Sequence, residues 1–358
     1  MDLKKQLMLK KIKEIFTNTG PKTLIGKNIN SVSNINNLNQ IFFKSYGNLN
    51  KDKIFYVIRR IPTAGFFSNI TFILNNLKIC EEMKFIPIID MEYYPSLYNE
   101  LKIFKNTKNS WEYYFEKLNK YSLNEVYNSK NVYLSPFTFQ KEMSIDMTNN
   151  RISKYINRLK VKKEILNKIN NFSEKNFIKK NKILGVHFRG STYKTARGHG
   201  FPLTIDLMIK NIETLIQNFN YEKIFLVTEE QKYLDALKKK FKNKIIFYNS
   251  FRMGQLDSFK IYPRKNHRYH LGEEILIETI LLSKCDGLTF IKSNVTSAAI
   301  LFAKKQIKLH EVYLGLNTRN KFFSKYLWLI KSMLPNYLGG LKYSYKKKGK
   351  LLMIIPFF

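Results

Sequence analysis

Cysteine is almost absent from this 358-residue chain, since only Cys80 and Cys285 are present. Both lie in apolar stretches, which predicts two buried, reduced thiols and excludes a disulfide framework. No apolar run reaches the roughly 18 residues that a membrane span needs. No early apolar block follows the basic N-terminus, as it would in a signal peptide. These absences predict a cytoplasmic protein.

Metal-binding and phosphate-binding motifs are missing as well. None of the eight aspartates forms an Asp-x-Asp pair, with which a sugar-nucleotide enzyme commonly holds Mg²⁺ or Mn²⁺. No His/Cys cluster has zinc-ligand spacing, and neither a P-loop nor a Gly-x-Gly-x-x-Gly motif occurs. We therefore expect no metal and no bound cofactor. A diphosphate would have to be neutralised by Arg, Lys and backbone dipoles.

Acidic residues are scarce relative to basic ones. The chain has 62 Lys and Arg against 27 Asp and Glu, for a net charge of +35. Such a charge favours anionic partners, although a general Lys, Asn and Ile bias explains it equally well. The 22 Tyr and 28 Phe keep a nucleic-acid-binding protein open as an alternative. Because the basic residues are spread out and no nucleic-acid motif is present, we expect no nucleic-acid partner.

The N-terminal half divides into a leader, residues 1–50, and a first domain, residues 51–180. Apolar residues recur at helical spacing among lysines early in the leader, which indicates either a membrane-surface helix or an ordinary surface helix. The Asn-rich remainder, 28–50, is predicted to be a loop. The domain is expected to open with a βαβ unit, whose strand, helix and strand are predicted at 54–58, 68–83 and 85–90. An irregular aromatic stretch, 92–145, and a polar helical one, 151–182, are expected to follow.

The second domain, residues 181–316, alternates strands and helices more regularly. Strands are predicted at 183–188, 223–228, 244–248, 287–291 and 307–312. Helices are predicted between them at 203–219, 231–241, 272–284 and 296–304. This alternation is typical of a doubly wound α/β fold with a mostly parallel sheet.

Polar groups follow three of these strands, so the topology should gather them at one edge of the sheet. The groups are His187, Arg189 and Gly190; Thr228, Glu229 and Glu230; and Ser293, Asn294, Val295, Thr296 and Ser297. An arginine can hold a phosphate through two hydrogen bonds. A capped helix start offers free N–H groups and a positive dipole. Together the three groups favour a ligand that carries phosphate.

These motifs, in this order, resemble the fucosyltransferase superfamily, which includes α-1,6-, nodulation and protein O-fucosyltransferases. The resemblance rests on 185–190, 224–230, 282–286 and 293–297. Two further segments, 64–69 and 109–115, resemble bacterial surface-glycan members, and the likeness covers about residues 54–315. It implies a GT-B fold, with two Rossmann-like domains facing a cleft. It also implies metal-independent, inverting transfer from GDP-fucose.

The resemblance also implies roles for individual residues. Arg189 would hold the β-phosphate and stabilise the leaving GDP, and His187 would lie beside the donor. Glu278 would bind the guanine edge, where a carboxylate can accept from N1–H and N2–H₂. The remaining donor-binding positions would be Gly190, Thr228, Glu229, Ser293, Asn294, Val295 and Thr296. An acceptor-side loop would contain Gly65, Ser68 and Asn69.

The chain departs from the family pattern in two ways. Gly190 and Thr192 replace the second arginine and the aspartate of many relatives, and Lys194 or Arg197 could substitute for that arginine. No carboxylate lies between Arg189 and Asp206, where some relatives carry a glutamate base. Asp90 and Glu92 are the catalytic-base candidates, with His199, or no protein base at all, as alternatives. A non-catalytic family member therefore stays open.

A tail, residues 317–358, mixes aromatic residues with lysines, which suits either an anionic bilayer or packing across the domains. The whole pattern predicts a glycosyltransferase that moves fucose or a related sugar from a GDP donor to a bacterial surface glycan, such as lipopolysaccharide or capsule. The enzyme could lie on the inner face of the cytoplasmic membrane. A different donor, such as a GDP-hexose or GDP-heptose, is the alternative within the same fold.

Overall fold

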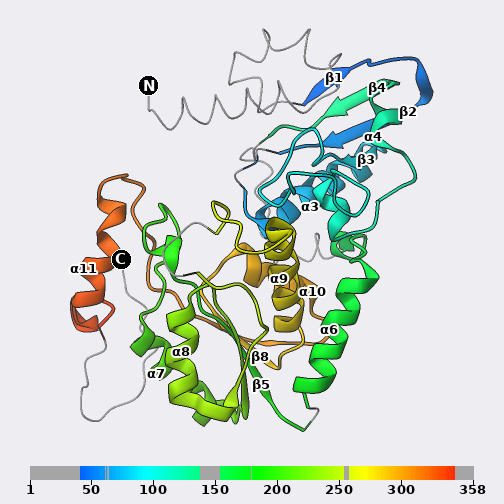
Figure 1. Ribbon diagram of the computed structural model, residues 1–358. Coiled ribbons are helices and arrows are strands. Elements are labelled where there is room, and N and C mark those ends of the chain that lie inside the picture. Colours follow the sequence, from blue (N-terminus) through cyan, green and yellow to red (C-terminus); the bar gives the residue numbers. More distant parts are fainter. Residues whose placement is uncertain are drawn as a thin grey trace. The chain divides into compact units, whose positions relative to one another are not determined.

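A computed structural model describes residues 41–60, 62, 64–137, 154–178, 180–253 and 258–342. The expected leader helix and the last part of the tail lie outside the described residues. The chain forms two compact units, which are treated separately below. The first contains residues up to Leu166 together with Tyr262–Glu273, and the second contains Asn167–Ile261 and residues from Glu274 onward. Each has its own parallel or mainly parallel sheet, which confirms the α/β class (Figure 1); the cleft between domains stays a prediction.

The first unit is built on a four-stranded sheet of order β1-β4-β2-β3. Its strands are β1 (Phe42–Lys44), β2 (Leu49–Ile58), β3 (Ile86–Ile89) and β4 (Ser129–Leu134). β2 runs parallel to both β3 and β4, whereas β1 is antiparallel to β4. The helix α3 (Phe66–Glu82) connects β2 to β3, so the predicted βαβ unit is confirmed. Short helical segments η2 (Ser110–Tyr113) and α4 (Leu123–Val126) lie in the connection to β4.

Two expectations for this unit were wrong. The predicted loop 28–50 contains β1 and the first residues of β2, and the stretch 92–145 contains β4. β4 begins with three polar residues and so lacks the apolar run of a typical buried strand. Only Val132 and Leu134 enter the core cluster, where they join Phe55 and Val57 of β2. The alternation of buried and exposed positions, rather than a hydrophobic run, was the signal that identifies it.

The second unit contains a five-stranded parallel sheet of order β7-β6-β5-β8-β9. The strands are β5 (Ile183–His187), β6 (Lys223–Val227), β7 (Ile245–Ile246), β8 (Gly287–Phe290) and β9 (Lys308–Glu311). The chain moves outward from β5 to β7 and then returns to place β8 on the other side of β5. The strand order therefore reverses between β5 and β8, and ligands of open α/β sheets bind at such a switch point.

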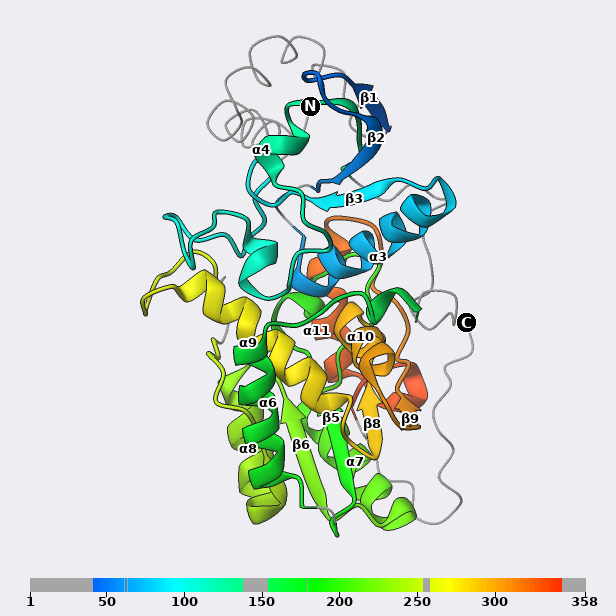
Figure 2. The same ribbon diagram turned by 90° about the vertical axis from the view of Figure 1, so that its right-hand side faces the viewer.

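Helices cover both faces of the second sheet (Figure 2). On one face α7 (Ile205–Phe219) and α8 (Gln231–Phe241) pack on Leu184 and Val186 of β5. The opposite face receives α6 (Lys163–Asn176) and the part of α9 (His267–Leu282) that belongs to this unit. Because both faces are covered, β5 and β6 read as nearly continuous apolar runs. This explains why the sequence predicted these two strands well.

The predicted boundaries need small corrections. β7 is two residues long instead of five, α9 begins at His267 instead of 272, and α10 (Asn294–Phe302) begins at Asn294 instead of 296. Cys80 and Cys285 are both buried and free, as expected. The described part of the chain ends with η6 (Phe323–Lys325), α11 (Leu327–Met333) and η7 (Asn336–Leu338). No helix in the described part is long and apolar enough to cross a membrane.

Candidate functional site at the carboxyl end of the second sheet

The register of β5 and β8 brings the first and third predicted motifs together. His187 is paired with Phe290 across these parallel neighbours. Arg189 follows His187 by two residues, and Ser293 follows Phe290 by three. Both segments therefore leave adjacent strands at the switch point of the sheet.

His187, the last residue of β5, has its side chain buried inside the protein. Its Nδ1 atom has no hydrogen-bond partner among the described residues. Burial, with a smaller contribution from the charge of Arg189, lowers the pKa of His187 to about 3. The imidazole is therefore neutral at physiological pH. It can donate or accept one hydrogen bond, but it supplies no charge to the site.

Arg189 combines burial with unused hydrogen-bonding capacity. Its side chain is 23% exposed, and its Nε lies 3.2 Å from Oε2 of Glu229. The two charges form an ion pair, but their alignment does not make a hydrogen bond, and Nε is buried without one. The guanidinium carbon lies 4.1 Å from the ring centroid of Tyr193, which holds the group from one side. This Nε can donate to a further oxygen, and the Nε atoms of Arg252 and Arg268 are in the same state.

Gly190 and Glu230 explain why the next position carries no second arginine. A Cβ atom at Gly190 would lie 2.1 Å from Oε1 of Glu230 and 2.7 Å from the Tyr233 ring. The buried Glu230 carboxylate in turn holds Lys194 at 3.1 Å. Lys194, a suggested substitute for the missing arginine, is therefore already paired with a carboxylate. Arg197, the other suggested substitute, is exposed.

The second motif contributes little free hydrogen-bonding capacity. The hydroxyl of Thr228 accepts from the N–H of Glu230 at 3.3 Å. Oε1 of Glu229 lies 3.4 Å from the N–H of Gly190, so this carboxylate contacts the backbone after β5 as well as Arg189. Both side chains thus shape the loop around Arg189.

The third motif is a capped helix start, as predicted. Ser293 and Thr296 form a capping box: the Ser293 hydroxyl accepts from the Thr296 N–H at 3.3 Å, and the Thr296 hydroxyl accepts from the Ser293 N–H at 3.0 Å. These hydroxyls are therefore engaged with the cap. The N–H groups of Asn294 and Val295 are in the first turn, where the helix itself provides no acceptor. They, with the helix dipole, are the anion-binding groups that this motif offers.

Glu278 on α9 is buried and paired, not solvated. Its Oε1 accepts from the Ser250 hydroxyl at 2.6 Å and lies 3.3 Å from a terminal nitrogen of Arg252. Burial raises the pKa of Glu278 to about 7, although Arg252 and Ser250 oppose this. Neighbouring Glu274 and Glu229 raise it further. The sequence did not reveal the Arg252 partner, because the pairing joins a loop to a helix 26 residues away.

Asp90 lies at the carboxyl end of β3 in the first unit and is fully buried. Its Oδ1 accepts from the N–H groups of Glu92 and Tyr93 at 3.0 and 2.9 Å, and its Oδ2 accepts from the Tyr127 hydroxyl at 2.6 Å. Burial raises the pKa of Asp90 to about 6 against these three hydrogen bonds. Both oxygens are occupied, so the carboxylate closes the turn after β3.

Glu92 and His199 are more accessible than Asp90. Glu92 is partly buried, and burial raises the pKa of its carboxyl group. His199 belongs to the second unit, and its ring contacts Tyr193 in a tilted arrangement, with 5.0 Å between the ring centroids. Burial and then the charge of Arg189 lower the pKa of His199, so its imidazole is neutral near pH 7. Each group is in a state suited to receiving a proton.

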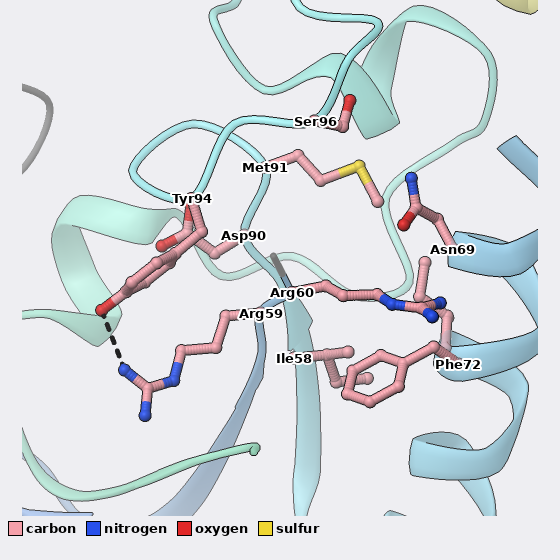
Figure 3. A pocket seen from close by; sticks show the side chains of 10 residues that line it. Ile58, Arg59, Arg60, Asn69, Phe72, Asp90, Met91, Tyr94 and Ser96 are labelled. Carbon is pink, nitrogen blue, oxygen red and sulfur yellow. Dashed lines mark hydrogen bonds between the residues drawn. The ribbon is translucent and has the colours of Figure 1, made fainter. Parts of the chain in front are cut away.

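A pocket in the first unit collects residues from the ends of β2 and β3 and from α3 (Figure 3). Arg59, which the sequence reasoning missed, is buried and donates from Nε to the Ser135 carbonyl at 2.9 Å and from a terminal nitrogen to the Tyr94 hydroxyl at 3.3 Å. Arg60 donates to the Ser68 hydroxyl at 3.0 Å, and burial lowers the pKa of Arg60 to about 10.

The predicted acceptor-side residues lie around this pocket. Asn69 lines it, Ser68 is held by Arg60, and Gly65 precedes α3 with open space at its Cβ position. The arginines follow directly after the predicted strand 54–58, so their position at a strand end was the available signal. Across the described ranges, no group of three His, Cys, Asp or Glu residues could hold a metal ion.

No known protein-family profile matches the chain, and no curated protein sequence matches it. The solved structures that match include NodZ α-1,6-fucosyltransferase, and one of the NodZ structures is of the enzyme from Bradyrhizobium. The NodZ structure soaked with GDP-fucose has 16% identity and a TM-score of 0.47, and the match covers 70% of this chain and 93% of that one. The structure of POFUT1 with GDP-fucose has 10% identity and a TM-score of 0.41, and the match covers 73% of this chain and 98% of that one. The structure of an Arabidopsis thaliana FUT1 variant with GDP has 10% identity and a TM-score of 0.42, and the match covers 88% of this chain and 81% of that one.

Proposed function

We propose that this protein is an inverting, metal-independent glycosyltransferase that moves L-fucose, or a related sugar, from a GDP-sugar to a glycan. The observation that carries the proposal is that Arg189 and the first turn of α10 follow shortly after β5 and β8, the two strands that pair at the switch point of the sheet. Arg189 supplies a cation whose Nε has no hydrogen-bond partner within the described ranges. The first turn of α10 supplies the N–H groups of Asn294 and Val295. This combination suits a pyrophosphate.

Arg189 is assigned the leaving-group role. As the glycosidic bond breaks, negative charge grows on the β-phosphate oxygens. A preorganised cation stabilises this charge more in the transition state than in the ground state. The ion pair with Glu229 and the contact with Tyr193 restrict the side chain, so little reorganisation is needed.

The acceptor hydroxyl must lose a proton during an inverting displacement. We assign the removal of this proton to Glu92, because its side chain is accessible and burial raises its pKa, which strengthens it as a base. His199 is the second candidate, because its side chain is exposed, although burial lowers its pKa. Asp90 is the less suitable member of the original pair, since its two oxygens are occupied. Glu278 is assigned to the guanine edge, and a bacterial surface glycan is the proposed acceptor.

Calorimetric titration with GDP and with UDP tests the donor assignment. We expect GDP to bind more tightly than UDP, and binding to weaken in Arg189→Ala but not in Arg158→Ala, which removes an exposed arginine from the first unit. Tighter binding of UDP would overturn the role of Glu278 and favour a different sugar-nucleotide donor. No binding of either nucleotide would overturn the proposed function.

A further inference from the structure

The segment 322–338 carries its apolar side chains on the outside of the second unit. Phe322, Met333 and Tyr337 are each about two-thirds exposed, at 67%, 65% and 70%. The other exposed apolar members are Phe323, Tyr326, Leu329, Ile330, Leu334 and Leu338. We call these nine residues the α11 surface. Soluble proteins rarely leave so many large apolar side chains together in water, so such a patch indicates a binding surface.

The α11 surface is outward because the other side of the segment is fixed to the unit. The Trp328 indole donates to the carbonyl of Pro202 at 2.8 Å, and Asn317 donates to the carbonyl of Ser324 at 2.9 Å. Lys331 donates to the carbonyl of Gly339 at 2.6 Å, which ties α11 to the residues just after the segment. Positions 326, 330 and 333 share a helix face that these contacts leave open. The apolar face is therefore presented on α11 (red in Figure 1), which the Trp328 hydrogen bond holds to the second unit.

The charge of the same segment is one-sided. Between residues 312 and 342 the chain has no Asp or Glu, and its basic residues are Arg319, Lys321, Lys325, Lys331 and Lys342. The sequence contains no acidic residue from 312 to its end at 358, where further lysines occur. A partner protein of mixed charge needs no such exclusion of carboxylates. An anionic lipid surface favours it, because each lysine near the headgroups adds to binding.

We propose that the α11 surface docks the protein on a bilayer that contains anionic lipid. Aromatic and aliphatic side chains enter the boundary between headgroups and acyl chains, while the flanking lysines and arginine contact the headgroup phosphates. The proposal does not depend on the sugar-transfer activity. It requires only the second unit and the lipid.

Flotation of the full-length protein with vesicles tests this inference. Wild-type protein should float with phosphatidylcholine vesicles that contain phosphatidylglycerol, and poorly with phosphatidylcholine alone. Leu329→Glu with Ile330→Glu should weaken binding at least about ten-fold, because two apolar side chains are lost and charge is added. Lys321→Gln with Lys325→Gln should weaken it by roughly five-fold per lysine. Added salt should weaken wild-type binding.

Matched controls separate the surface from general hydrophobicity and charge. Ile178→Glu replaces an isoleucine that is equally exposed outside the α11 surface, at 55% against 52% for Ile330. Lys238→Gln with Lys239→Gln removes two exposed lysines from α8. Both controls should bind as wild type, and all variants should keep the wild-type thermal midpoint. Wild-type binding by the Leu329/Ile330 variant would overturn the proposal. The proposal would also be overturned if the wild-type protein were a dimer that does not bind vesicles and the Leu329/Ile330 variant were a monomer.

Discussion

The carboxyl ends of β3 in the first unit and β5 in the second both carry buried polar atoms, but these atoms differ in their hydrogen bonds. At β3, the buried Asp90 receives three hydrogen bonds from its own neighbourhood. At β5, the buried Nδ1 of His187 and Nε of Arg189 receive or donate none. A buried polar group normally finds a partner inside the protein.

This difference separates Asp90, whose two oxygens accept hydrogen bonds inside the protein, from His187 and Arg189, each of which keeps a buried nitrogen without one in the described part of the chain. Asp90 ties the turn after β3 to Tyr127, which follows α4, and both its oxygens accept hydrogen bonds, although burial still raises the pKa of its carboxyl group. Arg189 is only partly compensated by Glu229. A carboxylate at a strand end and an arginine at a strand end look equally functional in a sequence. Hydrogen-bond satisfaction is what distinguishes them.

Removing the unsatisfied cation should have the largest effect. Arg189→Ala is expected to lower kcat/KM for sugar transfer by about 10²–10³-fold, the usual cost of losing one preorganised donor at a developing charge. Arg189→Lys should fall between wild type and Ala, since it keeps the charge but loses the fork. Steady-state transfer assays measure both. Unchanged turnover in Arg189→Ala would remove the side chain from the mechanism.

A side chain at Gly190 should destabilise the loop after β5 through a steric clash. Gly190→Ala places a methyl group against the buried Glu230 carboxylate and Tyr233, and it should lower the free energy of unfolding by about 1–3 kcal/mol. Denaturant titration measures this change. Gly65→Ala is the matched control, because its Cβ would meet open space and its φ of −68° suits alanine. Equal stability of the two variants would contradict the packing around Gly190.

Glu278 should make nucleotide binding depend on pH. Its carboxylate must be ionised to accept from guanine, and burial raises the pKa of Glu278 to about 7. GDP affinity should therefore rise up to about ten-fold from about pH 6 to about pH 8. Glu278→Gln should lose this rise in affinity. Its pH profile shows how much of the change comes from titration of the diphosphate itself, and this part can be subtracted from the wild-type profile. A wild-type profile identical to that of Glu278→Gln would contradict the assignment.

Asp90→Asn should have the smallest effect on activity and a visible effect on stability. Because burial raises the pKa of Asp90 to about 6 in the folded protein, the folded state holds its proton over a range where the unfolded chain has lost it. Wild-type stability therefore falls as pH rises from about 4 to about 6, by roughly 3 kcal/mol relative to Asn. Thermal unfolding against pH measures this. A loss of activity near 10²-fold or more would instead make Asp90 the catalytic base.

The sequence predicted the second sheet better than the first. Strands such as β5 and β6 are covered on both faces and so consist almost entirely of apolar residues. β4, in contrast, mixes polar and apolar residues, and its place beside β2 depends on long-range pairing with residues 77 to 80 positions earlier. Local patterns carry no information about such pairing.

For the candidate site, the sequence proposed residues whose roles stay predictions, and it did not reveal their partners. The cap at Ser293 follows from spacing alone, because a capping box is a local structure. The pairs Arg252–Glu278 and Lys194–Glu230 join residues 26 and 36 positions apart. Their formation depends on how the loops after β5 and β7 pack. The burial and pKa of Glu278 could therefore be known only from the structure.

A crystal structure of the protein with GDP tests the central claim most directly. The account predicts pyrophosphate oxygens within about 2.7–2.9 Å of the Arg189 guanidinium, as in a charge-assisted hydrogen bond, and beside the N–H groups of Asn294 and Val295. A pyrophosphate bound away from Arg189, or no nucleotide at the β5–β8 switch point, would contradict it.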